Sequence, residues 1–76
     1  MLRLHPVDSS SIETVGYDET DERLYVRFRD SGEGYVYLGV PQEVFEELMQ
    51  AESKGSFLNL SIKGRYPFRK LSRPPR

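Results

Sequence analysis

The chain of 76 residues contains no cysteine, no tryptophan and a single histidine, His5. Without cysteine there are no disulfide bonds, thiolate metal sites or thiol nucleophiles, so burial of apolar surface must stabilise the fold. No segment approaches the roughly 20 apolar residues that span a membrane, and the first residues lack the apolar stretch of a signal peptide. We therefore expect one small cytoplasmic domain with no membrane association.

Charge is distributed unevenly along the chain. Residues 1–53 carry four basic and twelve acidic side chains, a net charge of −8, whereas residues 54–76 carry seven basic side chains and no acidic one. Such a basic segment can fold back on the acidic half or project outward to meet a polyanion. We favour neutralisation within the molecule, with Glu43, Glu46 and Glu47 as candidate partners.

The spacing of apolar residues predicts an antiparallel meander of three strands. Residues 12–17 are rich in β-branched and aromatic side chains, residues 23–29 alternate strictly between apolar and polar, and residues 35–38 resume a short strand after a turn with two glycines. The first eleven residues, with Pro6 and three consecutive serines, are interpreted as a lead-in.

The turn between the second and third strands decides which tyrosines are buried. A tight turn centred on Ser31 and Gly32 places Phe28 opposite Tyr35, and directly opposed residues share a face of the sheet. The same register pairs Val26 with Tyr37, so both tyrosines are expected in the core. The outer face then carries Tyr25, Arg27, Arg29, Val36 and Leu38.

A helix is predicted to follow the third strand. Pro41 suits a first helical turn, an apolar stripe extends to Met49, and the helix should run to about Ser53. Lys54 complements the carboxyl end of this helix, and Gly55 is expected to close it in the left-handed conformation. For residues 56–63 the periodicity fits both a strand and a short helix.

Three groups of residues occur together in a recognisable order. They are Ser10-Ser11-Ile12 leading to Gly16-Tyr17-Asp18, then Tyr35-Val36-Tyr37 running into Val40-Pro41, then Ser53-Lys54-Gly55 followed by Phe57, Asn59, Ile62 and Tyr66. The pattern resembles the KTSC domain over about residues 8–70. That family of small bacterial modules also occurs at the carboxyl end of some lysyl-tRNA synthetases.

The resemblance implies a β-meander followed by helices, which favours a short second helix capped by Ser53 or Ser56. It also suggests RNA binding, although no activity is established for the family. Leu58 stands where the family commonly has an aromatic residue. Leu60 stands where a basic or polar residue is usual, which makes the segment after Gly55 less cationic.

Candidate catalytic and metal-binding residues lack the partners that such chemistry needs. His5 has no identifiable second group and is interpreted as a solvated terminal histidine. Ser9 to Ser11 have no base, and the acidic loop from Asp18 to Glu22 lacks the ligand pattern of a calcium site. Asn59 is interpreted as a capping or backbone-bonding residue. We expect no enzymatic activity, no metal site and no cofactor.

Basic and aromatic residues that alternate along the chain are candidates for nucleic-acid contact. Cations suit phosphates and aromatic rings stack on bases. In the carboxyl-terminal segment, Phe68 is interleaved with the cations. The predicted nucleic-acid-binding residues are Lys54, Lys63, Arg65, Tyr66, Arg69 and Lys70, together with Tyr25, Arg27 and Arg29 on the outer strand face.

The sequence thus predicts a single α+β domain: three antiparallel strands followed by one long and one short helix packed on one face. Its core spans about residues 8–70, and a flexible basic tail spans about 69–76. The first functional hypothesis is a small RNA-binding module. The alternative is a protein-interaction adaptor that uses the acidic helix face or the outer strand face.

Overall fold

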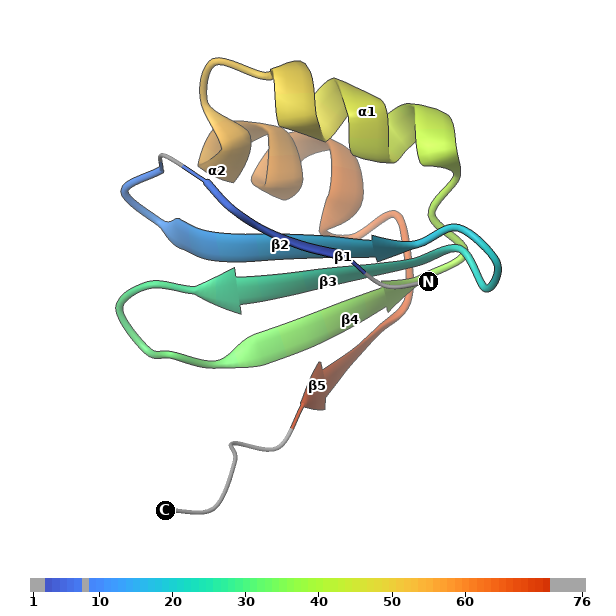
Figure 1. Ribbon diagram of the computed structural model, residues 1–76, viewed down its shortest axis with the longest axis horizontal. Coiled ribbons are helices and arrows are strands. Elements are labelled where there is room, and N and C mark those ends of the chain that lie inside the picture. Colours follow the sequence, from blue (N-terminus) through green and yellow to red (C-terminus); the bar gives the residue numbers. More distant parts are fainter. Residues whose placement is uncertain (1–2, 8, 72–76) are drawn as a thin grey trace.

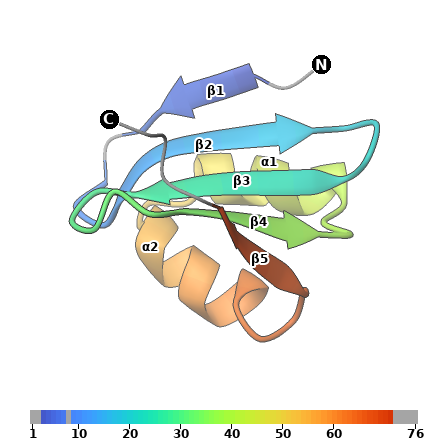
Figure 2. The same cartoon turned by 90° about the horizontal axis from the view of Figure 1, so that it is seen from below.

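The computed structural model describes residues 3–7 and 9–71 and shows an α+β fold of two layers. An antiparallel sheet with its strands in chain order forms one layer, and the helices lie on one face of it (Figure 1). Within these residues, the opposite face of the sheet carries no helix (Figure 2). The elements are β1 (Arg3–Pro6), β2 (Ile12–Asp18), β3 (Arg23–Phe28), β4 (Gly34–Leu38), α1 (Gln42–Gln50), α2 (Lys54–Phe57), the π-helix η1 (Leu58–Ile62) and β5 (Phe68–Leu71).

The sheet has five strands in place of the predicted three. β2, β3 and β4 are the predicted meander, whereas β1 lies in the segment interpreted as a lead-in and β5 includes three residues of the predicted tail. Each additional strand has four residues and lies at an edge of the sheet. Pro6 is compatible with an edge strand because such a strand needs hydrogen bonds on one side only. The rest of the predicted tail, residues 72–76, lies outside the described residues.

The register of the β3–β4 hairpin differs from the prediction by two residues. Leu24 pairs with Tyr37 and Val26 with Tyr35, because the turn is longer than expected and closes with a hydrogen bond from Phe28 N–H to the carbonyl of Glu33. A shift of two residues preserves the alternation of faces. The expected assignment of faces is therefore confirmed even though the expected pairs are wrong.

Helix α1 is shorter than predicted and Gly55 does not close it. The helix ends at Gln50, followed by Ala51 in an extended conformation, and Pro41 is its N-cap. Gly55 lies inside α2, where Ser53 caps the helix by accepting a hydrogen bond from Ser56 N–H. The helical interpretation of residues 56–63 is confirmed. A hydrogen bond of 2.8 Å from Lys63 N–H to the carbonyl of Leu58 spans five residues and defines the π turn of η1.

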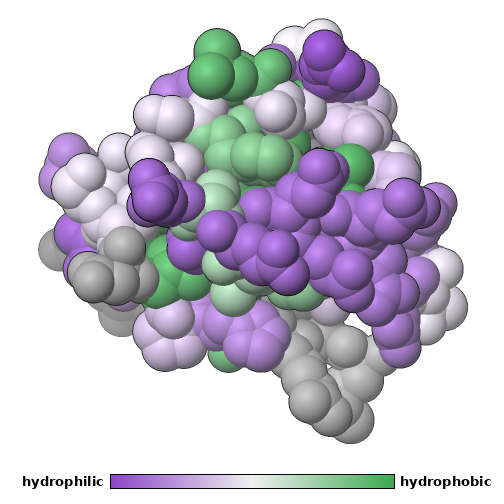
Figure 3. Space-filling model, turned by 90° about the horizontal axis from the view of Figure 1, so that it is seen from above, coloured by the Kyte–Doolittle hydropathy of each residue, from purple (hydrophilic) through white to green (hydrophobic). Residues whose placement is uncertain are grey.

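The core lies between the sheet and the helices. Tyr17 stacks on Phe45 of α1, with ring centroids 4.8 Å apart, and Tyr37 is 2% exposed. Figure 3 views the helix side, where a hydrophilic area extends across the centre and right of the surface and hydrophobic residues show above and to the left of it. The fully buried residues are Ile12, Val15, Leu24, Val26, Val40, Leu48, Leu58 and Ile62.

Candidate nucleic-acid interface

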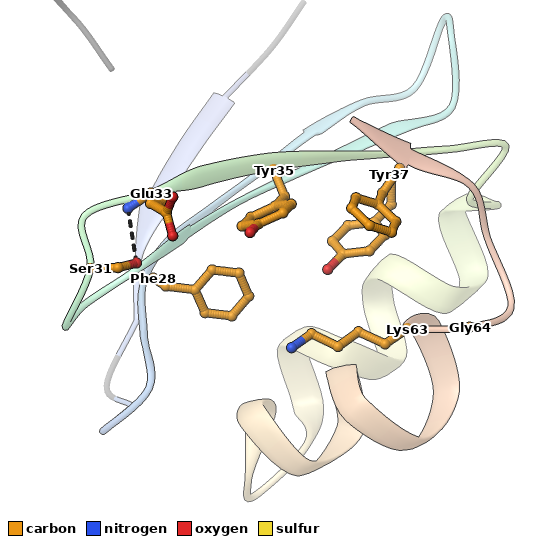
Figure 4. A pocket seen from close by; sticks show the side chains of 8 residues that line it. Phe28, Ser31, Glu33, Tyr35, Tyr37, Lys63 and Gly64 are labelled. Atoms are coloured by element: carbon orange, nitrogen blue, oxygen red, sulfur yellow. Dashed lines mark hydrogen bonds between the residues drawn. The ribbon is translucent and has the colours of Figure 1, made fainter. Parts of the chain in front are cut away.

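A cleft of about 380 Å³ opens between the β3–β4 part of the sheet and the end of η1. Figure 4 shows Tyr35 and Tyr37 projecting from β4 toward the helices, while Lys63 extends from the end of η1 toward Phe28. The register explains why the side chains converge, because Phe68 pairs with Tyr37 and opposed residues share a face. The lining residues are Phe28, Ser31, Glu33, Tyr35, Tyr37, Lys63, Gly64 and Phe68.

The aromatic rings of the cleft touch one another at steep angles. Phe28 meets Tyr35 edge-on, with centroids 5.6 Å apart and planes at 79°. Phe68 lies 5.6 Å from Tyr35 and 5.9 Å from Tyr37, both in tilted arrangements. Phe68 is 57% exposed, whereas Phe28 and Tyr35 are half-buried. The cleft therefore has a buried floor at Tyr37 and an apolar, accessible mouth at Phe68.

Two lysines reach the cleft region from different elements. The Nζ of Lys63 lies 5.1 Å from the centroid of the Phe28 ring, a cation–π arrangement. Lys70 of β5 forms an ion pair with Glu33 of the cleft wall. Because Lys70 pairs with Tyr35 in the sheet, it shares the helix-facing side with the aromatic rings. Arg65 is exposed in the turn after η1.

Burial raises the pKa of the Tyr37 phenol above its usual value of 10.0, and the nearby Tyr35 adds a smaller effect in the same direction. A raised pKa keeps the Tyr37 hydroxyl neutral at physiological pH. The floor of the cleft is therefore an uncharged surface that can both donate and accept a hydrogen bond.

Three of the predicted contact residues take part in the fold itself: Arg29, Lys54 and Tyr66. Arg29 follows β3, and its guanidinium donates to the carbonyls of Val7, Ser9 and Ile12. It holds the β1–β2 connection and is thereby engaged in the fold. Lys54 donates to the carbonyl of Ala51 at 3.1 Å, which confirms its expected position at the carboxyl end of α1.

Tyr66 is partly buried and packs against the core cluster, so it does not line the cleft. Its ring fills space in the core, where sequence alone could not distinguish it from the neighbouring Phe68.

The remaining predicted residues lie on the other side of the sheet. Tyr25 and Arg27 of β3 face outward, and alternation along β5 places Arg69 there too. Arg27 donates to the carbonyl of Gly32. Val36 lies on this face as expected, but it is only 5% exposed and is flanked by Arg69 and Leu71. The predicted set of nine residues is thus divided between two faces.

Lys70 of the basic segment is paired with an acidic residue of the same molecule, but that acid is not one of the three expected. Glu33, in the β3–β4 hairpin, is the partner of Lys70, whereas Glu43, Glu46 and Glu47 are exposed on α1. α1 packs over β2 through Phe45 and Tyr17. The acidic helix and the basic rim of the cleft consequently lie over different strands of the sheet.

The other polar candidates lie in β1, at the end of β2 and on η1. His5 lies half-buried in β1 with its ring 6.3 Å from Phe45, so it is not the solvated terminal histidine that we expected. Asp18 caps its own loop by accepting from the N–H groups of Thr20 and Asp21. Asn59 is exposed on η1. Among residues 3–7 and 9–71, no cluster of three or more metal-ligating side chains is present.

Sequence reasoning did not identify Phe28 and Glu33 as residues of the candidate site. The Tyr-x-Tyr pattern of β4 was the available signal for the cleft, but its tyrosines were assigned to the core. That assignment is correct for Tyr37 and only partly so for Tyr35, because no helix covers the sheet completely at that point.

The fold and the cleft define a small α+β domain with a helix-covered meander and an aromatic groove at one side. Residues 8–66 match the model of the KTSC domain, and the chain belongs to this family. It is 40% identical to a KTSC domain protein from Yersinia pestis of known crystal structure, with a TM-score of 0.89 over 95% of this chain and 100% of the other.

Two further relatives show the contexts in which similar sequences occur. A protein of Tsukamurella paurometabola is 46% identical over 63 residues, which cover 83% of this chain and 92% of that protein. A lysine–tRNA ligase of Nostoc punctiforme is 40% identical over 65 residues, 86% of this chain but 11% of the ligase. In the described part of the chain, no helix has the length and apolar character needed to cross a membrane.

Proposed function

We propose that this domain is a non-catalytic cytoplasmic module that binds single-stranded RNA through three cations of its basic carboxyl-terminal segment, Lys63, Arg65 and Lys70. The observation that carries the proposal is the placement of two lysines around an aromatic cleft: Lys63, from the end of η1, lies over the Phe28 ring, and Lys70, from β5, is paired with Glu33 of the cleft wall. Cations that neutralise phosphates supply most of the sequence-independent affinity for nucleic acid. Accessible rings such as Phe68 add stacking.

The arrangement of charge supports a polyanionic ligand. The exposed acids of α1 lie over β2, whereas the cations lie beside β4 and β5. Salt screens exposed charges, with a Debye length of about 10 Å in 0.1 M salt, so a strand of RNA interacts most strongly with the charges it lies against. A strand along the basic segment would therefore experience the lysines more strongly than the acidic helix.

The relatives support RNA as the polyanion. A segment similar to this chain forms part of proteins named lysine–tRNA ligases in Nostoc punctiforme and Trichormus variabilis. A domain joined to an enzyme that acts on tRNA is well placed to contact RNA as an accessory binding surface.

Fluorescence anisotropy with a labelled single-stranded RNA at several salt concentrations tests the proposal. If Lys63, Arg65 and Lys70 each meet a phosphate, the slope of log affinity against log salt should be about −2, from roughly 0.7 counterions released per contact. Lys63→Gln should weaken binding and flatten the slope by about 0.7.

Arg69→Gln is the matched control. It also removes one positive charge, but Arg69 lies in β5 on the opposite face of the sheet. It should leave affinity and slope close to those of the wild type. No anisotropy change at high micromolar protein in low salt would reject RNA binding. Binding of a protein partner that persists in high salt would then favour the adaptor hypothesis.

A further inference from the structure

The cleft between Tyr35, Phe68 and Lys63 offers more than a surface for phosphates. Its volume of about 380 Å³ is near the lower end of the range for small-molecule sites, roughly 300 to 1,000 Å³. Half of its lining residues are aromatic, with a few charged groups at the margin, which is the composition that orients a flat, partly polar ligand.

The angles between the rings limit what can enter. The planes of Phe28 and Tyr35 are nearly perpendicular, and the Phe68 ring is tilted by 55° from Tyr35 and 43° from Tyr37. These rings do not form a continuous flat platform on which several bases could stack in succession. A single flat ring can lie against one exposed ring face while the others surround its edges.

The charged groups of the cleft indicate which chemical group the flat ring of the ligand carries. Lys63 lies at the helix side of the cleft, where its ammonium group would meet an anionic group on the ligand, whereas Lys70 at the β5 side is paired with Glu33. Glu33 lines the wall beside the Ser31 hydroxyl, which itself accepts a hydrogen bond from Glu33 N–H. A carboxylate and a hydroxyl suit the donor and acceptor edge of a nucleobase.

We propose that this cleft binds one unpaired nucleobase, stacked against the accessible ring of Phe68, with its phosphate directed to Lys63. The inference rests on the proposed RNA binding and adds the site at which one base is held. It separates the base contact in the cleft from the phosphate contacts of Lys63, Arg65 and Lys70.

An abasic oligonucleotide separates the two contacts, because it keeps the phosphates and lacks the bases. We expect a single-stranded RNA hexanucleotide to bind roughly five-fold or more tightly than an abasic oligonucleotide of equal length, the effect of at least one stacked base. Equal affinity for the two would overturn the base site and leave the proposed RNA binding intact. Absence of binding to both in low salt would overturn both.

Phe68→Ala tests the location of the base. Phe68 is largely exposed, so its truncation should preserve the fold while reducing the preference for RNA over the abasic oligonucleotide to less than two-fold. Leu71→Ala is the matched control, since Leu71 lies on the same strand but on the opposite face. A preference unchanged by Phe68→Ala would show that the base binds elsewhere.

Nuclear magnetic resonance of the unmodified protein gives a second measurement that does not depend on any variant folding. Titration with cytidine monophosphate should shift the amide signals of Tyr35, Gly64 and Phe68 and leave those of α1 unchanged. Shifts confined to the outer-face residues, or no shifts at millimolar nucleotide, would contradict the proposed site.

Discussion

The phenolic hydroxyl of Tyr17 donates a 2.6 Å hydrogen bond to the carbonyl oxygen of Val40. This bond joins the end of β2 to the segment that leads into α1, and both residues are buried. Because the carbonyl of Val40 would lose this partner in a dry environment, removal of the hydroxyl costs more than an average hydrogen bond.

Tyr17→Phe should therefore lower the free energy of unfolding by roughly 1–3 kcal/mol, the cost of an unsatisfied buried polar group. Urea denaturation monitored by circular dichroism measures the change. Tyr25→Phe, on the half-exposed outer face, provides the control and should change stability by less than about 0.5 kcal/mol. Equal effects of the two substitutions would show that the bond contributes nothing specific.

The two buried tyrosines also predict a loss of stability at alkaline pH. Burial raises the pKa of both Tyr17 and Tyr37 above 10.0, with the acidic groups of Glu22, Glu19 and Asp18 adding to the effect on Tyr17. Above pH 10 the unfolded chain releases these protons while the folded chain retains them, so the unfolded state is favoured. The stabilisation is complete below about pH 10 and is lost as the pH rises through the raised values.

Urea denaturation at a series of pH values between about 8 and 11 measures this dependence, with the change expected above the ordinary tyrosine pKa. The double variant Tyr17→Phe/Tyr37→Phe should show a shallower decline than the wild type. Identical slopes in the two proteins would mean that other groups, such as lysines, cause the alkaline unfolding.

Gly55 illustrates how a correct local rule can be applied at the wrong place. A glycine after an amphipathic stretch commonly closes a helix in the left-handed conformation. Here the chain leaves α1 earlier, at Ala51, and Gly55 enters α2 instead. A Cβ at this position would lie 3.1 Å from the Oγ of Ser11 and 3.3 Å from its Cβ. The need for glycine is thus a long-range contact that the local sequence does not reveal.

Gly55→Ala should consequently fail to give the stabilisation of about 0.5–1 kcal/mol expected for alanine over glycine in a helix. We expect it to lower the free energy of unfolding. Combining it with Ser11→Gly should recover the helical gain, with a coupling energy of about 1 kcal/mol in the double-mutant cycle. A single Gly55→Ala variant more stable than wild type would show that Ser11 yields without cost.

The parts of the fold that were predicted are those with a strong periodic signal. Strict alternation identified β3, and the apolar stripe ending at Met49 identified α1. The correct faces of the β3–β4 hairpin survived an error of register, because a displacement of two residues leaves each side chain on its own face. β1 and β5 were missed since each has only four residues and is stabilised by pairing with a neighbouring strand.

The candidate site was predicted less well than the fold for a physical reason. Composition identified the cations, but the sequence gives no measure of which ones the fold itself uses. Arg29 is bonded to three backbone carbonyls and Lys54 to one, whereas Lys63 and Phe28 meet only because a π turn ends η1 above the sheet. Contacts of this kind depend on the tertiary structure.

The last prediction distinguishes the floor of the cleft from its wall. Tyr37 is almost fully buried, so Tyr37→Ala should cost about 3–5 kcal/mol, the range for truncating a buried aromatic side chain. Phe28 is only half-buried beside the open cleft, and Phe28→Ala should cost about half as much. Thermal and urea unfolding of both variants measure the difference.

Because Tyr37→Ala alone can exhaust the stability of so small a domain, Tyr37→Leu should be compared with Phe28→Leu in parallel. Equal losses in both comparisons would mean that Phe28 is as deeply packed as Tyr37 and that the cleft is closed in solution.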